Sequence, residues 1–369
     1  LFVVICILFP VLLFAKTDSD SLLQVLDKMI EDSQIYSNEK EAKLTKLREQ
    51  YKTATSDRQH YDFSAQLFRE YQSYKYDSAY AYAGMMLHYA ETLKNPNLVC
   101  ESKIALAFSC LSAGLYKEAT EISNSIDTTL LQSINKANLY LFLSVLNMNM
   151  ADFAAAEPYY VKYRSNSLKY CRNSIALFEN DSNEAIMAKI RECQLLEDYP
   201  QAILIAEHFL STKQPGLHDY AIVISSLGYF YEVRHDTAKA IRCFALAAIA
   251  DIKMATKETA AIRQLAELLY TQGDIQHAYS YAMHALDDAN FYNARQRKIE
   301  VGRILPIIEA GRFTIIKQQK DKLMMYAVLI SVLFVLFMIA TFIILMQKKR
   351  LNAARLLILQ QNIDLTQSN

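Results

Sequence analysis

Residues 323 to 346 form an unbroken run of 24 residues without a charged side chain, and this run constrains the chain more than any other feature. As an α-helix it would be about 36 Å long, which exceeds the hydrocarbon thickness of a bilayer, about 30 Å. A buried helix of a soluble domain is seldom uncharged over such a length. The run therefore predicts a transmembrane helix at 323–346, with a large domain before it and a short stub, 347–369, after it.

The orientation of this helix is predicted from the start of the chain. Residues 1–15 are apolar throughout, too few to span a bilayer but typical of the hydrophobic region of a secretion signal. Basic residues lie on both sides of the span, with Lys348, Lys349, Arg350 and Arg355 after it, so charge bias decides little. The signal-like start favours an inner-membrane protein with a periplasmic N-terminal domain and a cytoplasmic C-terminus.

The composition of the chain indicates an all-α fold. With only 7 Gly, 6 Pro and no Trp, it has too few turn residues for a sheet with many hairpins. Its 39 Lys and Arg balance 39 Asp and Glu, so we expect neither a basic face nor direct binding of nucleic acid. The cysteines at 100, 110, 171, 193 and 243 are expected as small buried residues on packed helices, a Cys100–Cys110 disulfide being the alternative.

Internal repetition decides which all-α fold is expected. Residues 221–252 carry Leu227-Gly228 and Tyr231, followed by Ala240, Phe244 and Ala247. This spacing resembles the tetratricopeptide repeat (TPR), a pair of antiparallel helices in which a small residue on the first helix lets the second approach closely. The other residues assigned to repeat packing are Ala119, Ala156, Tyr160, Leu265, Ala266, Gly273, Ala278, Ala282 and Ala285.

The repeats predict a TPR-type α-solenoid of about six helix pairs at 57–290. Their second helices are expected to open at small residues spaced 37 to 46 apart, namely Ala79, Ala119, Ala156, Ala202, Ala240 and Ala278. Two further helical patterns precede the solenoid at 18–56. A capping and connecting helix, interrupted by Gly302 and Pro306, is expected at 291–322.

The sequence carries no motif that predicts catalysis, a cofactor or a metal site. Neither a phosphate-binding G-x-x-x-x-G-K nor H-E-x-x-H nor G-x-S-x-G occurs, so we expect no enzyme. Repeat geometry places several aromatic and charged residues on the concave face formed by the first helices, which suits a peptide or glycan ligand. These candidate ligand-binding residues are Tyr229, Glu232, Arg263, Glu267 and Tyr270, and the alternative for them is an ordinary polar helix face.

The stub after the span repeats apolar residues at an interval of seven. Leu351, Ile358 and Leu365 occupy one heptad position, which predicts the start of a parallel coiled coil and a homodimer through the span and stub. The alternative is an amphipathic segment, 351–359, that lies on the inner leaflet.

Five short segments extend these patterns to a family resemblance. They are Tyr76-Asp77-Ser78-Ala79, Ala248-Ile249-Ala250-Asp251, Gly273-Asp274-Ile275, Asn290-Phe291-Tyr292-Asn293-Ala294-Arg295 and Ile304-Leu305-Pro306-Ile307. With them the chain resembles a bacterial family of membrane-anchored TPR regulators that contain a domain of unknown function. The resemblance implies a secretion signal, repeats, one span, a coiled coil and a C-terminal region like a helix-turn-helix, which the sequence up to Asn369 does not include.

The sequence therefore predicts a single-pass sensor or regulator. Its periplasmic solenoid would bind a protein, peptide or small ligand, and the span would signal to a cytoplasmic effector. Two alternatives stay open: the input half of a histidine kinase, and a membrane-anchored periplasmic scaffold. A phospho-acceptor His and an ATP-binding box in a continuation of the chain would favour the kinase.

Overall fold

A computed structural model describes residues 18–293 and 295–367 of the chain. The signal-like residues 1–15 lie outside the described residues. The chain divides into two compact units, the first ending at Glu309 and the second beginning at Ala310. All regular secondary structure in the described residues is helical, which confirms the all-α prediction.

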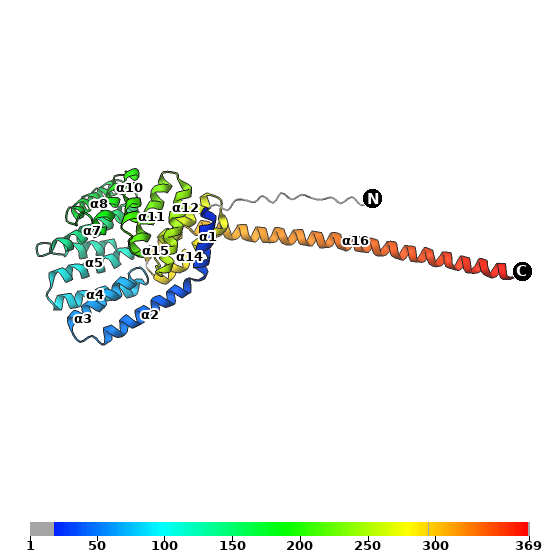
Figure 1. Ribbon diagram of the computed structural model, residues 1–369, viewed down its shortest axis with the longest axis horizontal. Helices are drawn as coiled ribbons and strands as arrows, with labels where there is room; N and C mark the ends of the chain where they lie inside the picture. The colour runs from blue at the N-terminus through cyan, green and yellow to red at the C-terminus, as the bar shows by residue number, and fades with distance from the viewer. Residues whose placement is uncertain (1–17, 294, 368–369) are drawn as a thin grey trace. The chain divides into compact units, whose positions relative to one another are not determined.

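The first unit contains the six predicted helix pairs (Figure 1). The pairs are α3 (Asp57–Tyr71) with α4 (Tyr76–Thr92), α5 (Pro96–Ser112) with α6 (Tyr116–Asn124), α7 (Ser133–Ala154) with α8 (Tyr159–Ile175), α9 (Asn183–Leu195) with α10 (Tyr199–Thr212), α11 (Leu217–Val233) with α12 (Thr237–Lys253), and α13 (Ala260–Thr271) with α14 (Ile275–Tyr292). Two helices precede them, α1 (Asp18–Glu31) and α2 (Ser33–Lys52), and α15 (Arg295–Gly302) follows them. The predicted solenoid is confirmed.

The last three pairs share one turn between their helices. In each turn, a residue with positive φ follows the first helix, and an Asp comes next. The Asp side chain accepts a hydrogen bond from the backbone N–H three residues later, which caps the second helix. The positive-φ residues are Glu197, His235 and Gly273, and the capping residues are Asp198, Asp236 and Asp274.

Small residues lie where the paired helices are closest. Gly228 on α11 faces the ring of the fully buried Phe244 on α12. The structure also buries Ala119, Leu227, Tyr231, Ala240, Ala247, Leu265, Ala266, Ala278, Ala282 and Ala285. Tyr160 is half-buried near the start of α8, and Gly273 lies in the turn before α14 with φ of 84°. The core thus follows the small-residue pattern in five of the six pairs.

The α7–α8 pair departs from the pattern, and the expectation for Ala156 is wrong. Ala156 is exposed and lies in the loop before α8 instead of opening the helix. Helix α7 ends where Ala155 takes a left-handed conformation, and Pro158, which lacks an N–H, stands at the start of α8. The buried contact between these two helices is made by Ser144 and Ser167, whose hydroxyl oxygens are 3.1 Å apart.

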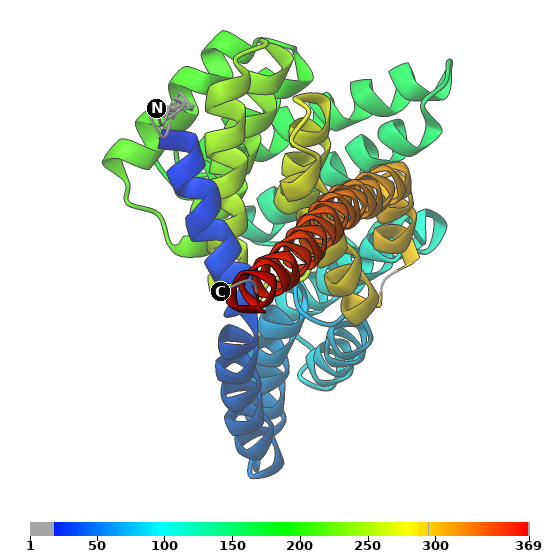
Figure 2. The same cartoon turned by 90° about the vertical axis from the view of Figure 1, so that its right-hand side faces the viewer.

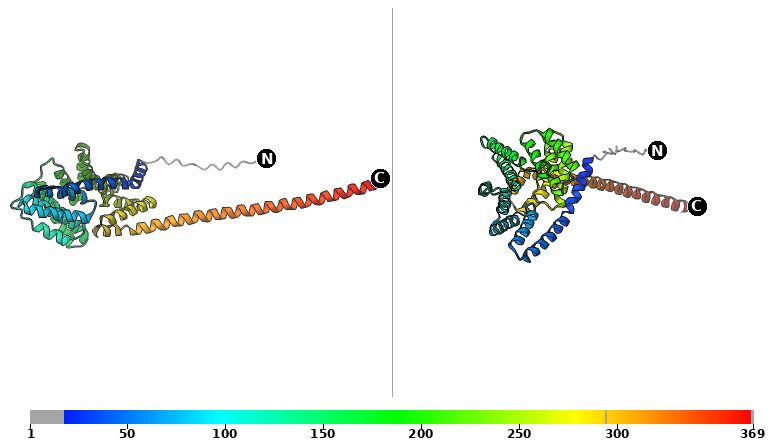
Figure 3. Two further views of the ribbon diagram at one scale, coloured as in Figure 1. Left: turned by 90° about the horizontal axis from the view of Figure 1, so that it is seen from below. Right: turned by 60° about the vertical axis from the view of Figure 1, so that its left-hand side comes forward.

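The solenoid curves until its first and last parts touch (Figures 1 and 3). The Tyr281 hydroxyl on α14 donates to Asp27 Oδ1 on α1 at 2.9 Å, and the Tyr292 hydroxyl donates to the Gln72 carbonyl at 2.7 Å. The backbone N–H of Lys257, in the α12–α13 loop, donates to the Ser73 carbonyl in the α3–α4 loop at 2.6 Å. Helix α1 packs along α12 (Figure 2) and contributes Leu23 and Leu26 to the largest core cluster.

After α14 the chain breaks twice before its last helix. Asn293 ends α14 in a left-handed conformation, and the residues between α15 and α16 (Leu305–Gln367) are Arg303 and Ile304. Pro306 therefore lies in the first turn of α16, where a missing N–H costs nothing. Within the second unit, α16 is long and apolar enough to cross a membrane, and the apolar side chains of 323–346 are exposed.

Candidate functional site

A cavity of about 850 Å³ lies on the inner side of the curved solenoid. Its wall is formed mainly by the first helices of successive pairs, because these line the concave face, and by α15. The lining residues are Tyr116, Met148, Asn149, Asp152, Phe153, Ala155, Tyr160, Gln194, Ser225, Ser226, Tyr229, Arg263, Gln264, Ile299, Glu300 and Arg303. A volume of this size suits a small-molecule ligand or a few residues of a peptide.

Aromatic rings supply the apolar part of this wall. The Tyr116 and Phe153 rings lie 5.2 Å apart, and the Tyr229 ring meets Tyr199 edge-on at 6.2 Å. Burial, with a smaller contribution from the hydrogen bond to Tyr199, raises the pKa of Tyr229 to about 12. Tyr229 therefore stays neutral at physiological pH and offers a ligand both a ring face and a hydroxyl.

Charged groups of both signs line the same cavity. Arg263 Nη1 donates to Glu267 Oε1 at 2.8 Å, but its Nε is buried without a hydrogen-bond partner. Asp152 is accessible to solvent, yet the surrounding protein desolvates it enough to raise the pKa of its carboxyl, against the opposing effect of Arg164 and Arg303. The cavity wall thus carries both acidic and basic groups, and one buried arginine donor, Arg263 Nε, is left without a hydrogen-bond partner.

The structure brings two of the five predicted binding residues into the cavity, Tyr229 and Arg263. Glu267 lies beside them as the partner of Arg263. Glu232 does not line the cavity, but burial, with Glu267 adding to it, raises the pKa of its carboxyl. Tyr270, which is 36% exposed, is not among the lining residues.

Sequence reasoning missed the contribution of α15 to the site. Ile299, Glu300 and Arg303 line the cavity, whereas the sequence predicted only a connector there. It also missed Asp152 and Phe153, which line the cavity. Both lie in the last turn of α7, which at 22 residues is longer than the first helix of a typical repeat. No spacing signal marks them, because the interval from Ala119 to Ala156, which contains α7, is the shortest of the series at 37 residues (156 − 119).

A side pocket of about 110 Å³ adjoins the cavity and shares Gln194 and Ser226 with it. It lies across α7, α9 and α11, and its only charged lining residue is Arg191. Its other lining residues are Leu141, Val145, Met187, Ile190, Ile222 and Val223.

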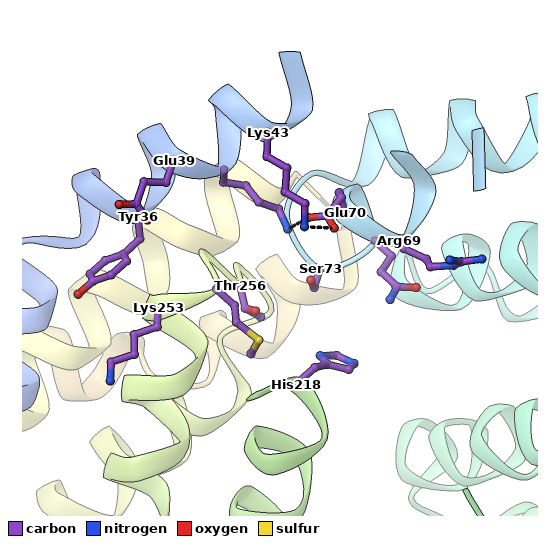
Figure 4. A pocket seen from close by; sticks show the side chains of 12 residues that line it. Tyr36, Glu39, Lys43, Arg69, Glu70, Ser73, His218, Lys253 and Thr256 are labelled. Carbon is purple, nitrogen blue, oxygen red and sulfur yellow. Dashed lines mark hydrogen bonds and ion pairs between the residues drawn. The ribbon is translucent and has the colours of Figure 1, made fainter. Parts of the chain in front are cut away.

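Another pocket, of about 480 Å³, lies where the first pair meets α11 and α12 (Figure 4). Lys40 and Lys43 of α2 each donate to Glu70 at 2.7 Å. Burial would raise the pKa of Glu70, but these two lysines outweigh it and hold the pKa below its usual range. Within this pocket Glu70 thus acts as the shared counter-ion of Lys40 and Lys43.

The five cysteines in the described residues are not joined by disulfides. Cys100, Cys110, Cys171, Cys193 and Cys243 are free thiols, and all but Cys193 are buried. Burial raises the pKa of Cys171 to about 11, which keeps it protonated. Nowhere in the described part of the chain do three or more His, Cys, Asp or Glu side chains meet as metal ligands would.

Several solved structures resemble the chain, including three at 15–16% identity. A thermophilic TPR protein of Thermus thermophilus shares 16% identity at a TM-score of 0.32, over 68% of this chain and 99% of its own. The apo form of RapI shares 15% identity at 0.35, over 83% and 86%. Cut9–Hcn1 of an APC/C hetero-tetramer shares 16% at 0.41, over 78% and 56%.

The family of this chain is assigned from its match to a family model, and the helix pairs agree with that match. None of the curated proteins compared matches the chain. The profile of the SusR N-terminal TPR domain matches residues 30–303, about three quarters of the chain and all six helix pairs. The chain belongs to the SusR N-terminal TPR domain family.

Proposed function

We propose that this protein is a single-pass inner-membrane sensor whose periplasmic TPR solenoid binds a protein, peptide or small ligand in the inner cavity. Binding is then signalled through α16 to a cytoplasmic effector. TPR solenoids serve as interaction scaffolds, and the cavity adds a concave, partly aromatic site of ligand size. Exposed apolar side chains along 323–346 favour lipid around this part of α16.

The observation that carries the proposal is the double role of α15. Ile299 and Glu300 of α15 and Arg303 just after it line the cavity, and only Arg303 and Ile304 separate α15 from α16. Val301 of α15 and Ile304 after it are buried in the core, so packing sets the position of α15 relative to the cavity. A ligand that contacts α15 and favours one position of it would transmit that preference into α16. A ligand with equal affinity for both positions would transmit nothing.

Photo-crosslinking in intact cells tests the binding site. A benzophenone amino acid at position 264, in the cavity wall, should give a discrete adduct, and the adduct should disappear in Arg263→Glu. The same probe at Lys169, which is exposed on α8 away from the cavity, is the control. Equal adducts at both positions, or an adduct at 264 that Arg263→Glu leaves unchanged, would refute the cavity as the binding site.

Reporter fusions test the orientation. Alkaline phosphatase, which folds only outside the cytoplasm, should be active when fused at Thr212 and inactive when fused at Lys349. Phosphatase activity at Lys349 together with none at Thr212 would show the opposite topology and remove the periplasmic ligand from the proposal.

A further inference from the structure

Arg191 differs from its neighbouring arginines in having no counter-ion. Arg172 pairs with Glu192 at 2.7 Å, and Arg164 pairs with Glu197 at 3.1 Å. By contrast, no hydrogen bond or ion pair joins the Arg191 guanidinium to any residue that the structure describes. The side pocket that it lines contains no acidic side chain.

An unpaired guanidinium in such a place is unfavourable for the free protein. Desolvation by the surrounding helices lowers the pKa of Arg191, although part of the residue still reaches solvent. Its nitrogens are not among the buried unpartnered atoms of the described residues, so water still hydrates them in part, and a partner or hydrogen bonds would offset the hydration that is lost. The protein supplies neither, so the arrangement is explained more directly by a partner from outside.

The geometry of the side pocket says which part of a ligand fits there. Its volume, about 110 Å³, admits a small anionic group but not a whole peptide or sugar. It opens to the larger cavity through the shared Gln194 and Ser226, whose side chains can donate hydrogen bonds to the same anion. Apolar walls such as Ile190 and Val223, which are both buried, exclude water and strengthen an ion pair formed between them.

We propose that the side pocket binds the anionic group of the ligand, with Arg191 as its counter-ion, while the body of the ligand occupies the aromatic cavity. This inference rests on the proposed binding function of the inner cavity and narrows its ligand class to molecules with a carboxylate, phosphate or sulfate group.

The proposal predicts opposite effects of one substitution on stability and on binding. Arg191→Met keeps the length of the side chain but removes the unpaired charge, so the ligand-free protein should melt at a higher temperature than wild type. The same variant should lose anion binding by about tenfold or more, because a hydrogen-bonded ion pair is lost. A residue that merely held the fold together would show the reverse effect on melting.

The test uses full-length protein in detergent and four defined probes at matched ionic strength. Hexanoate supplies a carboxylate with an apolar tail, hexanamide is its neutral counterpart, and butyl phosphate and butyl sulfate distinguish the source of the anion. Melting temperature and calorimetric titration are measured for wild type, Arg191→Met, Arg191→Lys and Arg172→Met. Arg172→Met is the matched control, because it removes an arginine that is ion-paired and lies outside both cavities.

At least one anion should bind wild type and Arg172→Met, bind Arg191→Lys more weakly, and bind Arg191→Met about tenfold or more weakly than wild type, while hexanamide binds none of them. Equal binding of hexanoate and hexanamide, or failure of all three anions to bind wild type, would overturn the inference. Loss of stability in Arg191→Met would also overturn it, since the guanidinium would then be part of the fold. None of these outcomes affects the crosslinking at position 264. If the anions fail to bind but the crosslink forms, the cavity binds a neutral ligand, and only the inference about Arg191 is overturned.

Discussion

Gly228 lies so close to the ring of Phe244 that a single added carbon atom, a Cβ, would clash with it. A Cβ built there would stand 2.6 Å from Cδ1 of Phe244, whose side chain is fully buried and cannot move into solvent. Gly228→Leu should therefore overpack the α11–α12 contact and lower the free energy of unfolding by about 1–3 kcal/mol or more. Urea denaturation followed by circular dichroism measures this loss.

Gly84 provides the matched control for this prediction. It lies within α4, and a Cβ there would meet no atom within 4 Å. Because glycine weakens a helix interior, Gly84→Ala should raise the free energy of unfolding by about 0.5–1 kcal/mol, whereas Gly228→Ala should lower it. Equal effects of the two alanine substitutions would mean that the close approach to Phe244 has no energetic consequence.

Asp251 makes the stability of the fold depend on pH. Its carboxyl lines a small cavity with Thr259, His284 and Asp288, and burial, followed by Glu258 and Asp288, raises its pKa to about 8. An unfolded Asp titrates near pH 3.9. The folded state therefore holds a proton that the unfolded state has lost between about pH 4 and pH 8, so stability falls as pH rises through this range.

Asp251→Asn should remove this decline, because the amide does not titrate. The difference in free energy of unfolding, variant minus wild type, should grow between pH 5 and pH 8 when measured by urea denaturation. His284 acts in the opposite direction, since burial lowers its pKa and stability is lost as pH falls below about 6.5. Both proteins retain His284, which removes most of its effect from the difference. A difference that stays constant across this pH range would contradict the prediction.

At the scale of the element, the turn of the last three pairs recurs between α5 and α6 but lacks the capping side chain there. Leu115, at the N-cap of α6, has φ of −85° and ψ of 65°, close to Asp236 at −87° and 72°. Its side chain cannot accept the hydrogen bond that Asp236 accepts from the Lys239 N–H. Leu115→Asp should therefore cap α6 and stabilise the protein by about 1 kcal/mol, measured by thermal or urea unfolding.

Two further variants separate the cap from the loss of the leucine. Leu115→Ala removes the same apolar side chain without adding an acceptor, so only the difference between Asp and Ala reports the cap. Asp236→Ala should show the converse loss at α12. If Leu115→Asp is no more stable than Leu115→Ala, the shared backbone geometry is insufficient for capping.

The elements were predictable from sequence wherever small residues mark the packing of a pair. Ala202, Ala240 and Ala278 open α10, α12 and α14 and are completely buried. In α7 and α8, Ser144 and Ser167 make the close contact instead of alanines. These buried serines do not follow the small-residue spacing of the repeats, so the sequence pattern does not reveal them. The pattern was therefore extended to Ala156, which lies in a loop.

At the scale of the whole molecule, the closure of the solenoid was not predictable. It joins residues 184 (257 − 73) to 258 positions apart, and whether they meet depends on small rotations summed over six pairs. The inner cavity depends on the same curvature, which is why Tyr229 and Arg263 could be placed in it from repeat geometry but Ile299 and Arg303 could not. Arg191 was not predicted as a site residue either, because the absence of a counter-ion can be recognised only when the neighbouring residues in the fold are known.

Closure should make the unfolding of this solenoid more cooperative than that of an open array. Tyr281 and Tyr292 are completely or almost completely buried, and their hydroxyls bond across the closure. The double variant Tyr281→Phe/Tyr292→Phe should lower the melting temperature and speed amide exchange in α1 and α2 ahead of global unfolding. Tyr61→Phe is the control, because its hydroxyl bonds Glu101 between neighbouring pairs. Equal acceleration of exchange in both variants would mean that closure adds no coupling.

The last prediction concerns how two copies of the second unit associate. Leu351 and Ile358 are exposed on α16 at heptad spacing, with Leu365 next in the series, so two copies can form one parallel seam. Three heptad positions alone are too few to hold a dimer, so the span must contribute to it. Single cysteines at positions 351, 354, 358 and 365 in a cysteine-free, full-length protein should crosslink in membranes most strongly at 351, 358 and 365. A segment lying on the inner leaflet would instead give weak crosslinks without a seven-residue period, and that result would exclude the seam as the route of signalling.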